Sequence, residues 1–175
     1  MGAATRRRTS STTPTSIADV TFSLGHPSGR RPPFKFSSYT RVGFSDTDAQ
    51  GIVYYGRYLP YFDLARVEYA RHLGVLAIDV GDCAFVMRAC SVVYEAPARF
   101  DDLLEVFIRT KRIGRTSLTS EYSAVRVEDD ALMCTAEQTL VLVEMAERRS
   151  MPIPESYRSA IERFEGADLE LTVAR

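Results

Sequence analysis

One long stretch of the sequence alternates hydrophobic and polar side chains with a helical period. From residue 58 to residue 73, apolar side chains return at every third or fourth position, mostly with charged side chains between them. This spacing places the apolar side chains on one face of an α-helix. Gly74 follows and is typical of the residue that ends a helix. We expect one helix of about 18 residues, with an apolar face made of Tyr58, Tyr61, Phe62, Ala65, Tyr69 and Leu73.

The other patterned segments read as β-strands. An imperfect alternation of apolar and polar residues predicts a first strand from Lys35 to Phe44. One long helix combined with a run of antiparallel strands predicts an α+β domain, in which the sheet wraps over the helix. A short amphipathic helix is expected from Glu155 to Phe164. The four strands expected between the two helices are Phe85 to Tyr94, Leu103 to Ile113, Ser117 to Val127 and Leu132 to Val143.

The two ends of the chain lack such patterns. Residues 1–33 are rich in Ser, Thr, Pro, Gly and Arg, and they contain one acidic residue, Asp19. Such a segment buries too little apolar surface to offset its ordering entropy, so we expect disorder there. Arg6-Arg7-Arg8 faintly resembles an organelle transit peptide, but a bland tail is the favoured interpretation. We therefore expect one domain at residues 34–165, followed by a C-terminal tail at residues 166–175.

Composition excludes several function classes. The 175 residues carry a formal net charge of −1, whereas a nucleic-acid partner requires a basic surface. No apolar run reaches the roughly 20 residues of a membrane helix. Cys83, Cys90 and Cys134 are odd in number and widely spaced, which disfavours a structural zinc site. We expect a cytoplasmic protein that binds no metal, nucleic acid or membrane.

The segment between the first strand and the helix carries the candidate chemistry. It contains an Asp-x-Asp-x-x-Gly pattern that starts at Asp46. A calcium-binding EF-hand loop would need an oxygen ligand at Gln50 and a glutamate at Arg57, so the cation at position 57 excludes it. A nucleotide-sugar metal site would need a parallel nucleotide-binding sheet, which the pattern does not predict. Helix capping remains as the structural alternative and would explain one aspartate.

Capping does not explain the residues that come after the two aspartates. Gly51 and an apolar run to Tyr55 lead directly into the expected helix. Backbone N–H groups at a helix start can stabilise a developing oxyanion, and a carboxylate on the preceding loop can act on the same carbonyl carbon. The carboxylate can serve as a base or as a nucleophile. The segment therefore indicates that the chain can catalyse acyl transfer without a catalytic serine, a catalytic histidine or a metal ion.

These residues resemble a known family. Residues 44–55 (Phe-Ser-Asp-Thr-Asp-Ala-Gln-Gly-Ile-Val-Tyr-Tyr) closely resemble the 4-hydroxybenzoyl-CoA thioesterase family of hotdog proteins. The resemblance continues in residues 94–102, 112–115 and 152–155, and it covers roughly Phe36 to Ile161. It implies a hotdog fold, in which an antiparallel sheet wraps around one long central helix. Relatives linked to the Tol–Pal envelope system commonly carry His at the position of Tyr55, a difference that argues against that subgroup.

The resemblance also implies roles for individual residues. Asp48 would be the catalytic carboxylate, Tyr55 would donate its main-chain N–H to the thioester carbonyl, and Gly51 would let the loop turn closely. Asp46 would brace the loop. Coenzyme A would be part of the substrate, so no separate cofactor is expected. Family members form dimers and often tetramers with sites at the dimer interface, so a homo-oligomer, a homotetramer in particular, is expected.

Other candidate residues have weaker support. Tyr54 and Tyr58 can line a substrate pocket, although a core stripe has the same spacing. Asp63 and Glu68 occupy the helix, where another hotdog subgroup places its carboxylate, and a solvated or interface role is favoured for both. His72 receives no role. The arginines that could reach the phosphates of coenzyme A are Arg112, Arg115, Arg148 and Arg149.

The sequence thus favours hydrolysis of an acyl- or aroyl-CoA thioester. A carrier-protein thioesterase of lipid or polyketide synthesis would use the same Asp48 machinery on another thioester. A non-catalytic acyl-CoA-binding domain is the third reading, but a sensor has no need of the Asp48 carboxylate. A hotdog hydratase would need an Asp and His pair, and no histidine lies in the expected core strands or in the Asp48 loop.

Overall fold

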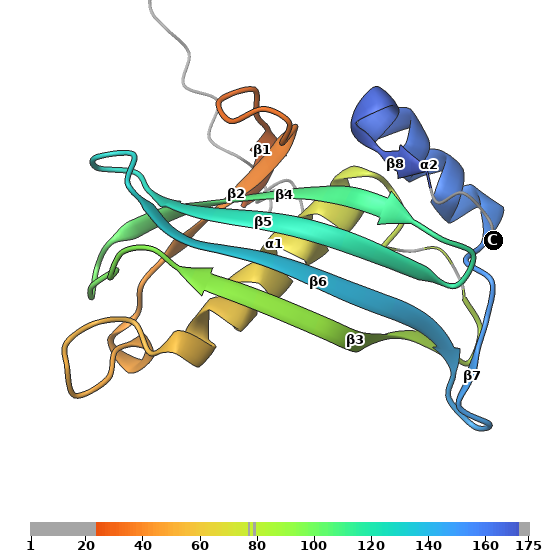
Figure 1. Cartoon of the computed structure of the whole chain (residues 1–175), viewed down its shortest axis with the longest axis horizontal. Helices are drawn as coiled ribbons and strands as arrows, with labels where there is room; N and C mark the ends of the chain where they lie inside the picture. Colours follow the sequence, from red (N-terminus) through yellow and green to blue (C-terminus); the bar gives the residue numbers. More distant parts are fainter. Residues whose placement is uncertain (1–23, 77, 79, 172–175) are drawn as a thin grey trace, which may run out of the picture.

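The fold is an antiparallel sheet curved around one long helix (Figure 1). The computed structural model describes residues 24–76, 78 and 80–171. Helix α1 (Tyr58–His72) is preceded by the 3-10 turn η3 (Tyr55–Arg57), and helix α2 (Glu155–Glu165) covers the far end of the sheet. The strands are β1 (Gly25–Pro27), β2 (Phe36–Arg41), β3 (Cys83–Tyr94), β4 (Leu103–Ile113), β5 (Ser117–Arg126), β6 (Leu132–Glu144), β7 (Arg149–Ser150) and β8 (Glu170–Leu171).

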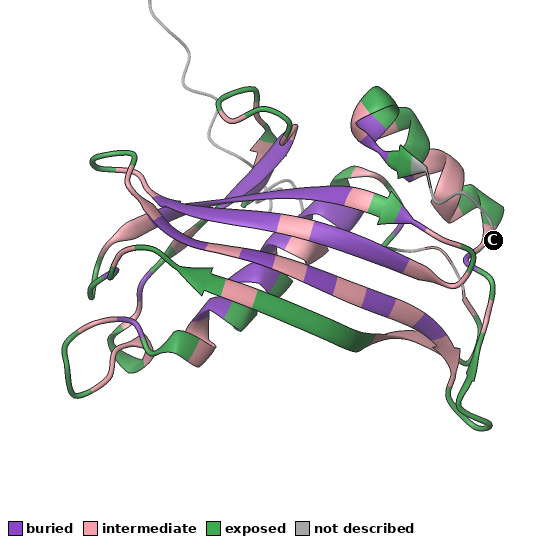
Figure 2. Cartoon of the chain, viewed as in Figure 1, coloured by how far each residue is buried: buried purple, intermediate pink, exposed green. Residues whose placement is uncertain are grey.

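Six strands follow each other across the sheet in the order β1-β2-β4-β5-β6-β3. Neighbours in this row are antiparallel, while β7 pairs with β6, and β8 pairs with β4 in parallel. The row ends at β3, whose outer side has no strand beside it among the described residues. Several side chains of β3 are correspondingly exposed (Figure 2), among them Met87, Val93 and Tyr94, which are 47%, 52% and 48% accessible.

The core lies between α1 and one face of the sheet. Phe62 and Ala65 of α1 are fully buried, and the Phe62 ring lies 4.8 Å from the ring of Tyr122 in β5. Alternate residues of the strands point at the helix, so Tyr122 and Ala136 face α1 while Glu121 faces away from it. Burying one large apolar side chain stabilises a fold by roughly 1.5–3 kcal/mol, so this shared layer holds helix and sheet together.

The α+β prediction is confirmed, with shifts at the element ends. Strand β4 has the predicted bounds, and β3, β5, β6 and α2 differ from prediction by one or two residues. The strand expected to reach Phe44 ends at Arg41 instead. The Asp46 carboxylate accepts the N–H of Gly43, which turns the chain into the 3-10 turn η2 (Phe44–Asp46). Phe44 is therefore 83% exposed and belongs to no strand.

Both expected tails reach into the fold. Strand β1 lies within residues 1–33, where disorder was expected, yet it pairs with β2. Arg30 beyond it forms an ion pair with the buried Glu105 of β4. At the other end, β8 lies within residues 166–175 and pairs with β4. These parts of the two expectations are corrected, because ladder hydrogen bonds order both short segments. Residues 1–23 and 172–175 of the expected tails lie outside the described residues.

A buried carboxylate connects α2 to the sheet and to α1. Glu165, at the end of α2, is fully buried and accepts hydrogen bonds from the Tyr69 hydroxyl and from the Thr110 N–H at 2.8 Å. Burial raises the pKa of Glu165 and outweighs these hydrogen bonds, which act in the opposite direction. Glu165 thus anchors α2 to β4 at the point where the pairing register of β4 with β5 shifts, between Thr110 and Arg112.

Candidate active site

The loop between β2 and α1 is braced by Asp46. One carboxylate oxygen, Oδ2, accepts the Gly43 N–H and the Tyr61 hydroxyl, each at 2.8 Å. The other, Oδ1, lies 3.2 Å from Nε of Arg57, and the main-chain oxygen of Asp46 accepts the Tyr54 N–H at 2.9 Å. Burial, together with the hydrogen bond to Asp46, raises the pKa of Tyr61 well above its usual value. Both oxygens of Asp46 are therefore engaged, which agrees with the bracing role expected from the resemblance.

Asp48 is held differently from Asp46. Its Oδ1 accepts the Gln50 N–H at 2.8 Å, and its main-chain oxygen accepts the Gly51 N–H at 3.0 Å. Gly51 has φ +73°, a left-handed conformation that glycine adopts without strain. Within the described residues, Oδ2 of Asp48 has no hydrogen-bond or ion-pair partner. One carboxylate oxygen thus fixes the side chain, and the other is available for chemistry.

The start of the helix presents a main-chain donor. The Tyr54 carbonyl accepts the Arg57 N–H at 2.8 Å, which closes the 3-10 turn ahead of α1. The N–H of Tyr55 begins this turn and has no acceptor among the described residues, as expected for the first residue of a helix. The Tyr55 side chain is 62% exposed. The Tyr55 N–H, to which the resemblance assigns the thioester carbonyl, is thus a main-chain donor without an acceptor in the part of the chain that the structure describes.

Asp48 and Tyr55 line one cavity of about 400 Å³, called the Asp48 cavity below. Three segments meet there: the Asp48 loop, the helix start, and the residues that end β3 and follow it. No lysine, arginine or histidine is among the lining residues, whereas two carboxylates are. The lining consists of Asp48, Gln50, Ile52, Val53, Tyr55, Tyr58, Tyr94, Glu95, Ala96 and Pro97.

The two tyrosines predicted to bind substrate differ in position. Tyr58 lines the Asp48 cavity, but its ring is buried in the core, and burial raises the pKa of its hydroxyl to about 12. Tyr54 is not among the lining residues, and its ring centroid lies 4.2 Å from that of Tyr55. Tyr94 and Glu95 were not predicted to line the site, although both lie in residues 94–102, a segment that carries the family resemblance.

The other predicted candidates lie outside the cavity. Asp63 forms an ion pair with Arg66 at 3.1 Å, and Glu68 forms one with Arg71. The four arginines considered for phosphate binding lie in or beside β4, β5 and β7, at the end of the sheet opposite to the Asp48 loop (Figure 1). Within residues 24–76, 78 and 80–171, no group of three or more His, Cys, Asp or Glu side chains could hold a metal ion. No helix in these ranges is long and apolar enough to cross a membrane.

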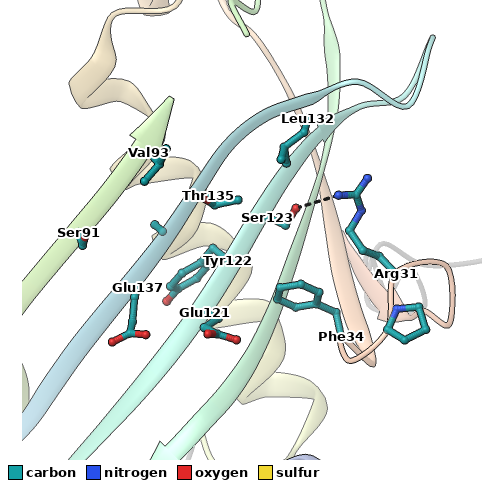
Figure 3. Close-up of a pocket in the computed structure, with 12 residues that line it drawn as sticks. Arg31, Phe34, Ser91, Val93, Glu121, Tyr122, Ser123, Leu132, Thr135 and Glu137 are labelled. Carbon is teal, nitrogen blue, oxygen red and sulfur yellow. Dashed lines mark hydrogen bonds between the residues drawn. The ribbon is translucent and has the colours of Figure 1, made fainter. Parts of the chain in front are cut away.

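A second hollow of about 470 Å³ lies on the sheet face opposite to α1 (Figure 3) and is called the outer groove. Arg31, Pro32 and Phe34 form one wall, and Arg31 lies 3.5 Å from the Ser123 hydroxyl, to which it donates. Glu121 in its floor pairs with Arg109 and Lys111, each at 2.7 Å. The outer groove is larger, but its carboxylates are already neutralised. The Asp48 cavity is therefore the better candidate for chemistry.

Comparisons with known proteins relate the chain to thioesterases. The thioesterase-like superfamily profile matches residues 42–161. The chain is 36% identical over 118 residues to the acyl-CoA thioester hydrolase YbgC of Escherichia coli O157:H7, covering 66% of this chain and 87% of that protein. It is 27% identical over 129 residues to the 1,4-dihydroxy-2-naphthoyl-CoA hydrolase of Synechocystis, covering 72% and 94% of the two chains.

Solved structures give the same result for the fold. A 1,4-dihydroxy-2-naphthoyl-CoA thioesterase from Synechocystis superposes with a TM-score of 0.66 at 25% identity, covering 71% of this chain and 93% of that one. A probable thioesterase from Bartonella henselae superposes with a TM-score of 0.62 at 29% identity, covering 67% and 98%. The predicted hotdog fold, with its sheet around one long helix, is confirmed.

Proposed function

This chain belongs to the thioesterase-like superfamily, and we propose that it hydrolyses an acyl- or aroyl-CoA thioester to the free acid and coenzyme A. One observation carries the proposal: the carboxylate of Asp48 and the first residue of the helix turn, Tyr55, line the same cavity. The named activities of the relatives from Escherichia coli and Synechocystis support this reaction class.

In the proposed reaction, Oδ2 of Asp48 acts on the thioester as a base or as a nucleophile. As a base it takes a proton from water while the water oxygen attacks the carbonyl carbon. The C–S bond then breaks, and the proton passes to the coenzyme A thiolate. As a nucleophile it displaces the thiolate and forms a mixed anhydride. Water then splits the anhydride into the free acid and the Asp48 carboxylate, and the remaining proton of the water passes to the coenzyme A thiolate. In both routes the Tyr55 N–H faces the developing oxyanion, and one such donor contributes about 3–4 kcal/mol to transition-state stabilisation.

The lining of the Asp48 cavity favours an uncharged acyl group. Two carboxylates, Asp48 and Glu95, face this space without a basic residue beside them in the lining. Three tyrosine side chains supply apolar surface with polar tips, which suits an aromatic or short aliphatic group. Coenzyme A enters as part of the substrate, so no separate cofactor is invoked.

We also propose that the working form is a homo-oligomer assembled through β3. This strand of twelve residues ends the row opposite to β1, no described strand pairs with its outer side, and exposed apolar side chains lie along it. An unpaired edge of this length readily accepts another strand. Antiparallel pairing of two copies around a two-fold axis would bring the arginine-bearing end of one sheet towards the Asp48 end of the other. A dimer is the minimal form, and a tetramer would pair two such dimers.

A thioester screen tests the proposal. Aliphatic, aryl and branched acyl-CoAs and acyl-carrier-protein thioesters are offered, and free thiol is measured. We expect turnover of at least one acyl- or aroyl-CoA, and we expect Asp48→Asn to abolish it while the melting temperature and oligomer size stay unchanged. If only carrier-protein thioesters are hydrolysed, the substrate is a carrier-protein thioester, and the reaction mechanism stays the same. A wild-type protein that binds acyl-CoA but hydrolyses no thioester would establish the sensor reading instead.

A further inference from the structure

Tyr94 joins the edge of the sheet to the start of the helix. It is the last residue of β3, where it pairs with Cys134 of β6. Its hydroxyl donates a hydrogen bond of 3.0 Å to the main-chain oxygen of Tyr55. Tyr94 also lines the Asp48 cavity. A side chain from a strand 39 residues further along the chain is thus bonded to the residue whose N–H faces the proposed reaction.

The hydrogen bond falls on a peptide unit next to the proposed donor. The Tyr55 carbonyl belongs to the peptide that joins Tyr55 to Gly56, and the Tyr55 N–H belongs to the peptide before it. That earlier peptide is held through its Tyr54 carbonyl, which accepts the Arg57 N–H at 2.8 Å. Two consecutive peptides therefore have fixed carbonyls, the first through the turn itself and the second through Tyr94. Since a peptide plane rotates as a unit, holding both restricts the direction of the Tyr55 N–H.

The Tyr94 ring is itself held in place. Its centroid lies 5.7 Å from that of Tyr58 with the planes at 62°, an edge-on contact. Tyr58 is buried in the core below the cavity, so the contact ties Tyr94 to a rigid part of the fold. A tyrosine hydroxyl is protonated and able to donate at neutral pH, and partial burial moves the pKa of Tyr94 further upward.

We propose that Tyr94 is a positioning residue for thioester hydrolysis, because its hydroxyl fixes the Tyr55–Gly56 peptide and thereby aims the Tyr55 N–H at the thioester carbonyl. The assignment rests on the proposed function. Tyr94 acts through the main chain of Tyr55 and needs no contact with the reacting atoms. Preorganised donors cost no reorganisation when charge develops, so loss of the hydroxyl should affect the chemical step more than substrate binding.

The test compares Tyr94→Phe with Tyr39→Phe. Tyr39 lies on β2, does not line the Asp48 cavity and is 36% exposed, so the control removes a comparable hydroxyl elsewhere. We expect Tyr94→Phe to lower kcat about tenfold with KM within about twofold, and Tyr39→Phe to leave both unchanged. Amide exchange at Arg57, whose N–H closes the turn on the Tyr54 carbonyl, followed by NMR, should accelerate only in Tyr94→Phe. The melting temperature of each variant confirms that it is folded.

The outcomes separate this assignment from the proposed function. If the wild-type protein hydrolyses thioesters and Tyr94→Phe has the same kcat, the assignment is wrong and the function stands. If Tyr94→Phe lowers kcat and raises KM by the same factor, the substitution has loosened the binding site and has not specifically misdirected the donor. That result would also overturn the assignment of Tyr94 as a positioning residue. If the wild-type protein hydrolyses no thioester, the function fails and the assignment fails with it. In that case, unchanged amide exchange in Tyr94→Phe would show that the hydroxyl does not hold the turn either.

Discussion

The Asp48 cavity and the outer groove are both lined by carboxylates, and they differ in what surrounds those carboxylates. In the outer groove, Glu121 pairs with Arg109 and Lys111, and Glu137 pairs with Lys111 at 2.9 Å. In the Asp48 cavity, Asp48 and Glu95 have no cation within ion-pair distance among the described residues. The outer groove is the larger of the two. A free carboxylate oxygen and a main-chain donor on residues that line one cavity, and not volume, distinguish the candidate active site.

The largest expected effect is on kcat, and it should occur in the Asp48 cavity and not in the outer groove. Asp48→Asn should lower kcat at least about 100-fold, because the amide cannot act as a base or a nucleophile. Glu121→Gln in the outer groove should change kcat by less than about twofold, because Glu121 is a structural ion-pair partner. Thiol release under saturating acyl-CoA measures both. A large loss of kcat in Glu121→Gln with a normal melting temperature would place the chemistry in the outer groove instead.

A smaller effect should reveal the unneutralised charge in the Asp48 cavity. Glu95→Gln should raise kcat/KM for succinyl-CoA relative to butyryl-CoA by about three- to tenfold, because it removes repulsion between two carboxylates. Glu137→Gln is the matched control in the outer groove and should leave the ratio unchanged. The wild-type preference should also weaken with rising salt, because exposed charges are screened. If neither Glu95→Gln nor salt changes this ratio, the negative charge of the cavity does not determine which acyl group is preferred.

The smallest effect concerns the contribution of the ion pairs in the outer groove to the free energy of unfolding. Burial raises the pKa of Glu121, but hydrogen bonds from Lys111 and Arg109 outweigh it, so the pKa is lowered overall. The ion pairs therefore stabilise the fold above the ordinary glutamate pKa, and this stabilisation is lost as pH falls through the lowered value. Glu121→Gln should lower the free energy of unfolding by roughly 1 kcal/mol at pH 7. Denaturant titrations at neutral and acidic pH should show the difference from wild type shrinking on acidification; a constant difference would contradict this.

Long periodic elements were predictable from the sequence, and short ones were not. Strand β4 has eleven residues, with apolar Leu104, Val106 and Ile108 at alternate positions, and its predicted bounds agree with the structure. Strands β1 and β8 have three and two residues, too few to show any period, and they are ordered by pairing with β2 and β4. The end of β2 was missed because the Asp46 carboxylate bonds the Gly43 N–H, a contact that alternation does not encode.

The same distinction applies to the candidate site. Asp48, Gly51 and Tyr55 lie within one short segment, so a local motif could indicate them together. Tyr94 and Glu95 reach the cavity only because β3 ends beside the helix start, which depends on the strand order of the whole sheet. The four arginines considered for coenzyme A binding carry the charge that such a site needs, but their position depends on the fold. They lie at the end of the sheet opposite to the Asp48 loop, which the sequence alone did not reveal.

The hydrogen bond from the Gln50 N–H to Asp48 has a practical consequence. An asparagine at position 48 offers a carbonyl oxygen in place of Oδ1, so the loop can keep its turn while the reactive oxygen is replaced by an amide nitrogen. Asp48→Asn is thereby suited to serve as a substrate trap, which would hold an intact thioester in the cavity. Crystals or mass spectra of this variant after incubation with a mixture of acyl-CoAs would then read out the preferred acyl group directly.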